Sequence, residues 1–98
     1  MSRVVITTDD MATLEYEAAP SGVVMVHLTV HNNVWSKAKY KEWKKRWEQI
    51  KLDTKEQGID ELFTLVPNND KKLNKFQRVF GFSLMLEFSD ANLYRQRI

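Results

Sequence analysis

The sequence has no cysteine among its 98 residues, and only two histidines, two prolines and three glycines. Without cysteine the chain can form no disulfide framework, no thiolate zinc site and no cysteine nucleophile, and two histidines alone are a poor basis for a metal site. Scarce proline and glycine, together with 43% hydrophobic residues, exclude a fibrous repeat and a disordered chain. We therefore expect one folded domain over residues 1–98.

Long apolar runs are missing as well. The apolar stretch at residues 4–6 is too short for a signal peptide, and no window approaches the length of a membrane span. These absences predict a cytoplasmic protein with no membrane partner.

Charge is balanced over the whole chain but unevenly distributed. The net charge of +2 is small for a nucleic-acid binder, yet residues 37–46 contain a single acid, Glu42, among many cations. The cations of this segment are Lys37, Lys39, Lys41, Lys44, Lys45 and Arg46. The segment fits a solvated helix face, a site for a phosphate-bearing ligand, or a surface for nucleic acid or an acidic protein. No base-reading motif is present, which disfavours nucleic acid.

Strand-like patterns fill the first third of the chain. Residues 3–7 are β-branched and apolar, residues 13–18 alternate polar and apolar side chains, and residues 23–30 form a dense β-branched run. Turn residues at 20–22 predict that the second and third segments form an antiparallel hairpin. Both faces of 23–30 are mostly apolar, so we expect a central strand covered on both sides.

Helical spacing begins after this hairpin. Tyr40, Trp43, Trp47 and Ile50 recur at steps of three and four, which predicts a long helix over residues 34–57 that ends at Gly58. Its N-cap candidates are Asn32, Asn33 and Ser36. Of the three tryptophans, Trp35 is expected to be the most exposed, and the other two to pack against the sheet.

The last third of the chain continues the alternation of strand and helix. Residues 62–66 predict a buried strand parallel to 23–30, because a helical crossover joins the two. Residues 68–70 predict the cap of a second helix that stops at Gly81, and residues 82–88 predict a last strand. Residues 89–98 are interpreted as a polar tail with at most a short edge strand near Leu93. The predicted fold class is α/β (α+β): a mixed sheet in which an N-terminal antiparallel hairpin is followed by β-α-β-α-β.

Two histidines are the candidate catalytic groups. His27 lies in mid-strand, and His31 lies at the C-terminal mouth of that strand, where open sheets bind ligands. Either imidazole can act as a general base near neutral pH. The alternative is a core histidine and a loop histidine, since no serine or carboxylate at hydrolase spacing accompanies them.

The order of motifs resembles a known family. A Val/Leu/His strand leads into Asn-Asn-Val-Trp at 32–35 and a long helix, followed by Phe-Thr-Leu-Val-Pro-Asn-Asn at 63–69 and Leu-Asn-Lys-Phe-Gln-Arg-Val-Phe-Gly-Phe at 73–82. This order is similar to the GNAT N-acetyltransferase superfamily, in the form of its small bacteriophage-encoded members. The resemblance covers residues 23–88.

The resemblance implies acetyl-coenzyme A (acetyl-CoA) between strands 23–30 and 62–66. Pantetheine would pair with the first strand, and the pyrophosphate would meet the start of the long helix. An amine would attack the thioester directly, with His27 or His31 as base. The implied cofactor-binding residues are Leu28, Thr29, Val30, Trp35, Ser36, Lys37, Ala38, Lys39, Tyr40, Asn68 and Asn69.

Some family features are replaced in this chain. Residues 35–39 contain no glycine, Gln77 stands where many members have a catalytic tyrosine, and the first strand and two helices that hold the acceptor are not recognisable. The alternative function is therefore a degenerate GNAT-fold binding module that engages a host or phage protein, in the host cytoplasm if it is phage-encoded. The partner would be an unknown amine acceptor or a host protein, and sheet extension beside the N-terminal hairpin would permit a homodimer.

Overall fold

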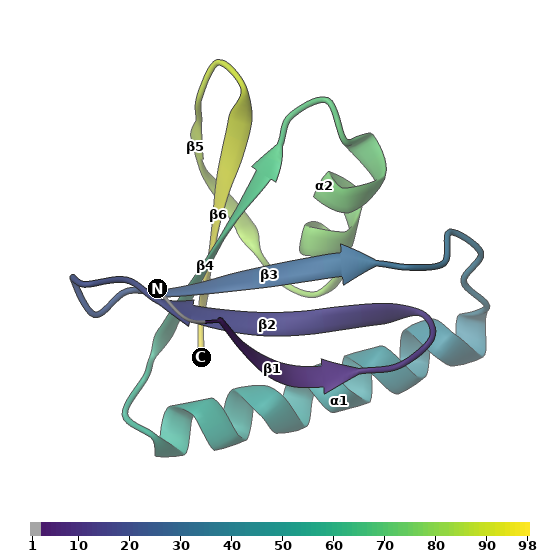
Figure 1. The fold of residues 1–98 in the computed structure, drawn as a ribbon, viewed down its shortest axis with the longest axis horizontal. Helices are drawn as coiled ribbons and strands as arrows, with labels where there is room; N and C mark the ends of the chain where they lie inside the picture. Colours follow the sequence, from purple (N-terminus) through teal and green to yellow (C-terminus); the bar gives the residue numbers. More distant parts are fainter. Residues whose placement is uncertain (1–2) are drawn as a thin grey trace.

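A computed structural model describes residues 3–98, which form a six-stranded mixed sheet with two helices (Figure 1). In chain order the elements are β1 (Arg3–Thr8), β2 (Ala12–Ala18), β3 (Val24–Val30), α1 (Lys37–Glu56), β4 (Glu61–Pro67), α2 (Lys71–Val79), β5 (Ser83–Glu87) and β6 (Ala91–Arg97). The strand order across the sheet is β1-β2-β3-β4-β6-β5. The predicted fold class, with its hairpin and its β-α-β-α-β segment, is confirmed.

The N-terminal half of the sheet is antiparallel. β2 and β3 pair from Ala12 with Val30 to Ala18 with Val24, as the hairpin prediction requires. β1 pairs antiparallel with β2, and its register shifts between Val5 and Thr7. These three strands form one continuous half of the sheet.

The two halves of the sheet meet between β3 and β4. These strands are parallel, and their register pairs just Met25 with Phe63 in the part of the chain that the structure describes. Beyond this pair β3 and β4 separate widely, as Figure 1 shows. The C-terminal end of β3 therefore turns one edge toward open space instead of toward β4.

Helix α1 begins and ends close to where the sequence predicts. The Ser36 hydroxyl caps it by accepting from the Lys39 N–H at 3.1 Å, and Gly58 follows its end with φ of 87°. Trp43 and Trp47 are buried against the sheet, which confirms the predicted packing stripe. Among residues 3–98, no helix is long and apolar enough to cross a membrane.

Both helices lie against the same face of the sheet. Trp47 Nε1 of α1 donates to the Phe80 carbonyl just after α2, at 2.9 Å. Val24 and Val26 of β3 are buried on this side, whereas Met25 is half-buried on the other. The prediction that β3 is central is confirmed, and the prediction that it is covered on both sides is wrong for the described residues. We call the face turned away from α1 and α2 the open face.

Residues 89–98 are not a polar tail. Residues 91–97 form β6, which lies between β4 and β5, and Tyr94 is 0% exposed. The polar side chains that made this strand look like a tail form hydrogen bonds inside the fold. Tyr94 OH donates to Asn74 Oδ1 at 2.8 Å, and Gln96 Nε2 donates to the Phe80 carbonyl at 2.8 Å. Buried polar groups with partners are compatible with a core strand.

The position of Tyr94 gives a direct test. Replacing Tyr94 with Ala should lower the free energy of unfolding by about 3–5 kcal/mol, because a large buried side chain is lost. Tyr94→Phe should cost about 1 kcal/mol, because only the bond to Asn74 is lost. Urea denaturation measures both. Arg97→Ala, on the exposed end of the same strand, is the control and should change stability little; a Tyr94→Ala variant as stable as this control would contradict the burial of β6.

Candidate functional site

A groove of about 290 Å³ opens where β3 and β4 separate. One wall is the C-terminal half of β3, and the other is the first turns of α2. The groove is lined by Leu28, Thr29, Val30, Asn33, Asp70, Lys72, Leu73 and Phe76. Because β4 does not pair with this part of β3, the backbone amides of Leu28 and Val30, which point away from β2, are available on this edge to a ligand that carries amides of its own.

The start of α2 is fixed at the groove by its own cap. Asp70, the N-cap residue, accepts a hydrogen bond from the Leu73 N–H at 3.0 Å. Two residues further on, Lys72 Nζ donates to the Asn33 carbonyl, so the β3–α1 loop is linked across the groove to α2. Among residues 3–98, Lys72 supplies the cationic head group of the groove lining, and Asp70 supplies a carboxylate.

An aromatic cluster lies between the start of α1 and α2. The Trp35 ring is 5.1 Å from that of Phe76 and 5.3 Å from that of Tyr40, and Tyr40 stacks on Phe76 at 5.5 Å. Trp35 also donates its indole N–H to the Asn32 carbonyl at 2.7 Å. Trp35 is the most exposed of the three tryptophans, as expected, because Trp43 and Trp47 are buried. Its ring is half-buried in this cluster.

The basic segment at the start of α1 is partly neutralised. Lys39 Nζ lies 3.5 Å from Asp9 and 3.3 Å from Glu42, and Arg46 lies 3.1 Å and 2.9 Å from the same two carboxylates. The exposed cations without an ion pair among residues 3–98 in this segment are Lys37, Lys41, Lys44 and Lys45. Of these, Lys37 is the nearest in sequence to the groove, at the first position of α1.

Asp9 fixes the β1–β2 turn to this helix. Burial of its carboxyl would raise the pKa, but hydrogen bonds from the Met11 and Ala12 N–H groups outweigh that effect. Lys39 and Arg46 add to them, so the pKa lies below its ordinary value of 3.8. Asp9 is thus a charged anchor that favours the folded state when it is ionised.

The two candidate histidines do not line the groove. His27 is on the open face, two residues beyond the Met25 pair, with Nε2 2.8 Å from Glu17 Oε1. His31 Nε2 lies 2.7 Å from the Thr13 hydroxyl and is exposed. The structure therefore separates them, and only His27 is held beside the point where the strands diverge. Within residues 3–98, no group of three or more His, Asp and Glu side chains could hold a metal ion.

The asparagines of the β4–α2 loop also lie outside the groove. Asn68 Nδ2 donates to the carbonyls of Phe88 and Ser89 at 3.1 and 3.2 Å, so it holds the β5–β6 turn. Asn69 and Ala38 are exposed. The groove residues that the sequence analysis missed are Asn33, Asp70, Lys72, Leu73 and Phe76. Their sequence pattern indicates helix caps and a core stripe. It could not assign them to the groove, because a sequence does not say which helix turn borders a gap in the sheet.

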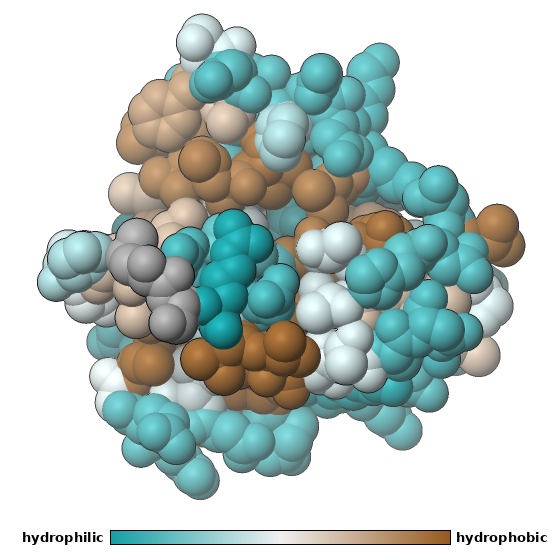
Figure 2. Space-filling view, in the orientation of Figure 1, coloured by the Kyte–Doolittle hydropathy of each residue, from teal (hydrophilic) through white to brown (hydrophobic). Residues whose placement is uncertain are grey.

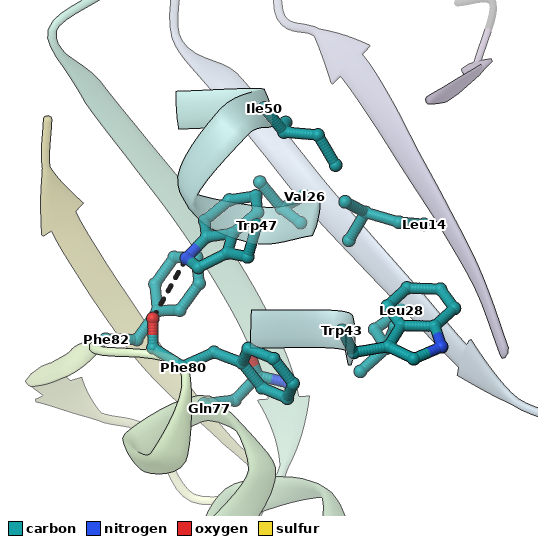
Figure 3. A pocket seen from close by; sticks show the side chains of 9 residues that line it. All are labelled: Leu14, Val26, Leu28, Trp43, Trp47, Ile50, Gln77, Phe80 and Phe82. Atoms are coloured by element: carbon teal, nitrogen blue, oxygen red, sulfur yellow. Dashed lines mark hydrogen bonds between the residues drawn. The ribbon is translucent and has the colours of Figure 1, made fainter. Parts of the chain in front are cut away.

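Gln77 faces the core. It is buried and lines a small cavity of about 30 Å³ with Trp43 and Trp47 of α1, as Figure 3 shows. The groove lining does not include it. A second hollow of about 500 Å³ lies at the other end of α1, and Tyr16, Asp53 and Thr54 are among its lining residues. It is distant in sequence and topology from the C-terminal ends of β3 and β4.

Known proteins match this chain in structure but not in sequence. Neither a protein-family model nor a curated protein matches the sequence. Solved structures do match: the N-acetyltransferase PseH of Campylobacter jejuni has a TM-score of 0.64 at 15% identity, over 89% of this chain and 59% of that one. The GNAT domain of S. lividans PAT has a TM-score of 0.69 at 14% identity, over 90% of this chain and 54% of that one. The chain has the GNAT fold.

The matched structures are of longer chains. A probable acetyltransferase from Staphylococcus epidermidis matches with a TM-score of 0.61 at 19% identity, over 93% of this chain and 64% of that one. PseH in complex with acetyl coenzyme A matches with a TM-score of 0.65 at 14% identity. This chain thus spans about 60% of the length of the solved chains it matches.

The Asp9 anchor predicts a pH-dependent stability. The pKa of Asp9 is lower in the folded chain than in the unfolded chain. The stabilisation that the Asp9 carboxylate gives is therefore complete at pH values above 3.8, and it is lost as the pH falls through the folded-state pKa. Asp9→Asn should therefore cost about 1–3 kcal/mol at neutral pH, and the gap to the unmodified chain should shrink below pH 3.8. Urea denaturation across this range measures it. A gap of constant size at all pH values would contradict the anchor.

Proposed function

We propose that the chain binds acetyl-CoA in the groove between β3 and β4 and transfers the acetyl group to an amine. The observation that carries this proposal is the separation of β3 from β4 beyond Met25, which leaves residues 28–30 facing a groove instead of a strand. The GNAT fold supports it, since PseH, which shares the fold, has been solved with acetyl coenzyme A.

The chemistry of the groove suits each part of the coenzyme. The pantetheine arm carries two amides, which can pair with the free backbone edge of residues 28–30 in the manner of an added strand. The phosphates are anionic and would be attracted by Lys72 and by Lys37 at the first turn of α1, where the helix dipole adds to the charge. Because residues 35–39 lack glycine, side-chain cations take the larger share of the phosphate contacts.

His27 is the base that the geometry supports best. It lies on the open face beside the divergence, and the Glu17 carboxylate, 2.8 Å from its Nε2, orients the ring. In the proposed reaction the amine nitrogen bonds to the thioester carbon, and the oxyanion is stabilised by backbone N–H groups of residues 28–30. The C–S bond then breaks, and the amine proton passes to His27. Gln77 cannot supply a proton, so coenzyme A leaves as a thiolate that solvent protonates.

Calorimetric titration with acetyl-CoA tests the binding step. We expect saturable binding, and Lys37→Glu should weaken it about fivefold, since reversing a charge near a helix N-terminus is worth about 1 kcal/mol. Lys55→Glu makes the same change in net charge at the other end of α1 and should leave the affinity unchanged. The absence of binding at millimolar acetyl-CoA would overturn the proposal, and equal effects of both variants would refute the phosphate position.

Substitution of His27 tests the chemical step. Thiol release from acetyl-CoA in the presence of a panel of primary amines should fall about 10²–10⁴-fold in His27→Gln, the usual contribution of a general base. Coenzyme affinity should stay the same, because His27 does not line the groove. His31→Gln is the matched control and should retain activity. If the two variants exchange these outcomes, the base is His31.

One observation supports the second candidate function, a GNAT-fold binding module without catalysis. Trp35 and Tyr40 pack on Phe76 and narrow the space between α1 and α2 beside the groove. If this packing excludes the coenzyme, Trp35→Ala should bind acetyl-CoA and the unmodified chain should not. The host or phage protein would then be the partner to seek.

A further inference from the structure

One row of side chains crosses the open face of the sheet from β2 to β6. Residues that pair directly across a sheet place their side chains on the same face. The register pairs Glu17 with Met25, and Met25 with Phe63. On the other side of β4 it pairs Phe63 with Arg95. The row therefore has a carboxylate at one end, two apolar side chains in the middle and a guanidinium at the other end.

The carboxylate end of this row lies beside the candidate base. Glu15 pairs directly across from His27, and the Glu17 carboxylate is 2.8 Å from His27 Nε2. In the part of the chain that the structure describes, Glu15 has no ion-pair partner. Primary amines are mostly ammonium ions in neutral water, so two carboxylates next to His27 attract an amine to this end of the row.

Apolar side chains widen the middle of the row on its β4 and β6 side. Leu65 lies two residues beyond Phe63 and is 49% exposed, and Leu93 of β6 pairs with it. Figure 2 shows apolar surface gathered over the region where β4, β5 and β6 lie, with polar surface around it. Clusters of exposed apolar side chains mark binding surfaces, whereas single ones are ordinary. This part of the open face suits an uncharged alkyl chain.

Arg95 supplies an unpaired cation at the far end of the row. Arg97, two residues further along the same face of β6, lies 3.4 Å from Glu61, whereas Arg95 has no ion-pair partner among the described residues. Its neighbour on β5 is the uncharged Ser83. Along the row, β6 lies two strand spacings from β3, or about 10 Å. A molecule that reaches from His27 to Arg95 therefore needs an amine, an apolar spacer of about this length and an anion.

We propose that the acceptor of the acetyl group is an ω-amino acid whose carboxylate binds Arg95. Its amine lies at His27, and its alkyl chain lies over the apolar side chains of β4 and β6. This inference rests on the acetyl transfer proposed above. The bound ammonium loses one proton to solvent before its nitrogen attacks the thioester, and the second proton passes to His27 as the C–S bond breaks. An α-amino acid is too short to reach both ends of the row.

Two acceptors of equal length, ω-aminooctanoate and octylamine, test the proposal because they differ in the terminal carboxylate. Thiol release from acetyl-CoA should show a KM about tenfold lower for ω-aminooctanoate at a similar kcat, the usual effect of one charge-assisted hydrogen bond. Arg95→Gln should remove this preference and leave the kinetics of octylamine unchanged. Arg97→Gln removes the same charge from the same face of β6 and is the matched control, which should keep the preference.

A chemical-shift titration without acetyl-CoA separates this inference from the transfer reaction. The Arg95 Nε–H signal should move with ω-aminooctanoate and not with octylamine, and the Arg97 signal should move with neither. Equal KM values for the two acceptors, or a preference that survives Arg95→Gln, would overturn the inference and leave the acetyl transfer standing. If no amine releases thiol, the transfer itself fails and the acceptor role falls with it; an unmoved Arg95 signal would overturn the binding site as well.

Discussion

Trp43 and Trp47 hold together two halves of a sheet that share little strand pairing. β3 and β4 are registered at Met25 and Phe63 alone in the residues that the structure describes, so backbone bonds join the halves weakly. The two indoles supply the missing connection: Trp43 Nε1 donates to Asp9 at 3.2 Å on the N-terminal side, and Trp47 Nε1 donates to Gln96 Oε1 at 3.1 Å on the C-terminal side. Both indoles belong to the one core cluster that contains buried residues of the two halves.

The same arrangement makes the candidate site. Because α1 joins the halves, β3 and β4 are free to diverge at their C-terminal ends, and the groove forms there. The β3–α1 loop, the start of α2 and the bare edge of residues 28–30 line it. The fold thus brings a helix N-terminus, a cation and free backbone amides around one space, and His27 lies on the open face, where it contacts Glu17.

Sequence patterns predicted the elements that alternate cleanly. The hairpin, the long helix with its Ser36 cap and the parallel crossover follow from period and capping residues, and the order of motifs indicated the GNAT superfamily. The strand containing Tyr94 was predicted as at most a short edge strand, because its residues Asn92, Tyr94 and Gln96 are polar, and their partners come from α2 and the turn after it. The groove residues Lys72 and Phe76 were missed because a groove depends on how two strands diverge, which no local pattern encodes.

An amide chemical-shift titration of the protein with acetyl-CoA tests most directly whether the coenzyme site lies between β3 and β4. We expect shifts concentrated at residues 28–30, at the start of α1 and at the start of α2, with saturation at a common affinity. Shifts confined to the hollow beside Tyr16 and Thr54, or no saturable shifts at all, would contradict a coenzyme site in this groove.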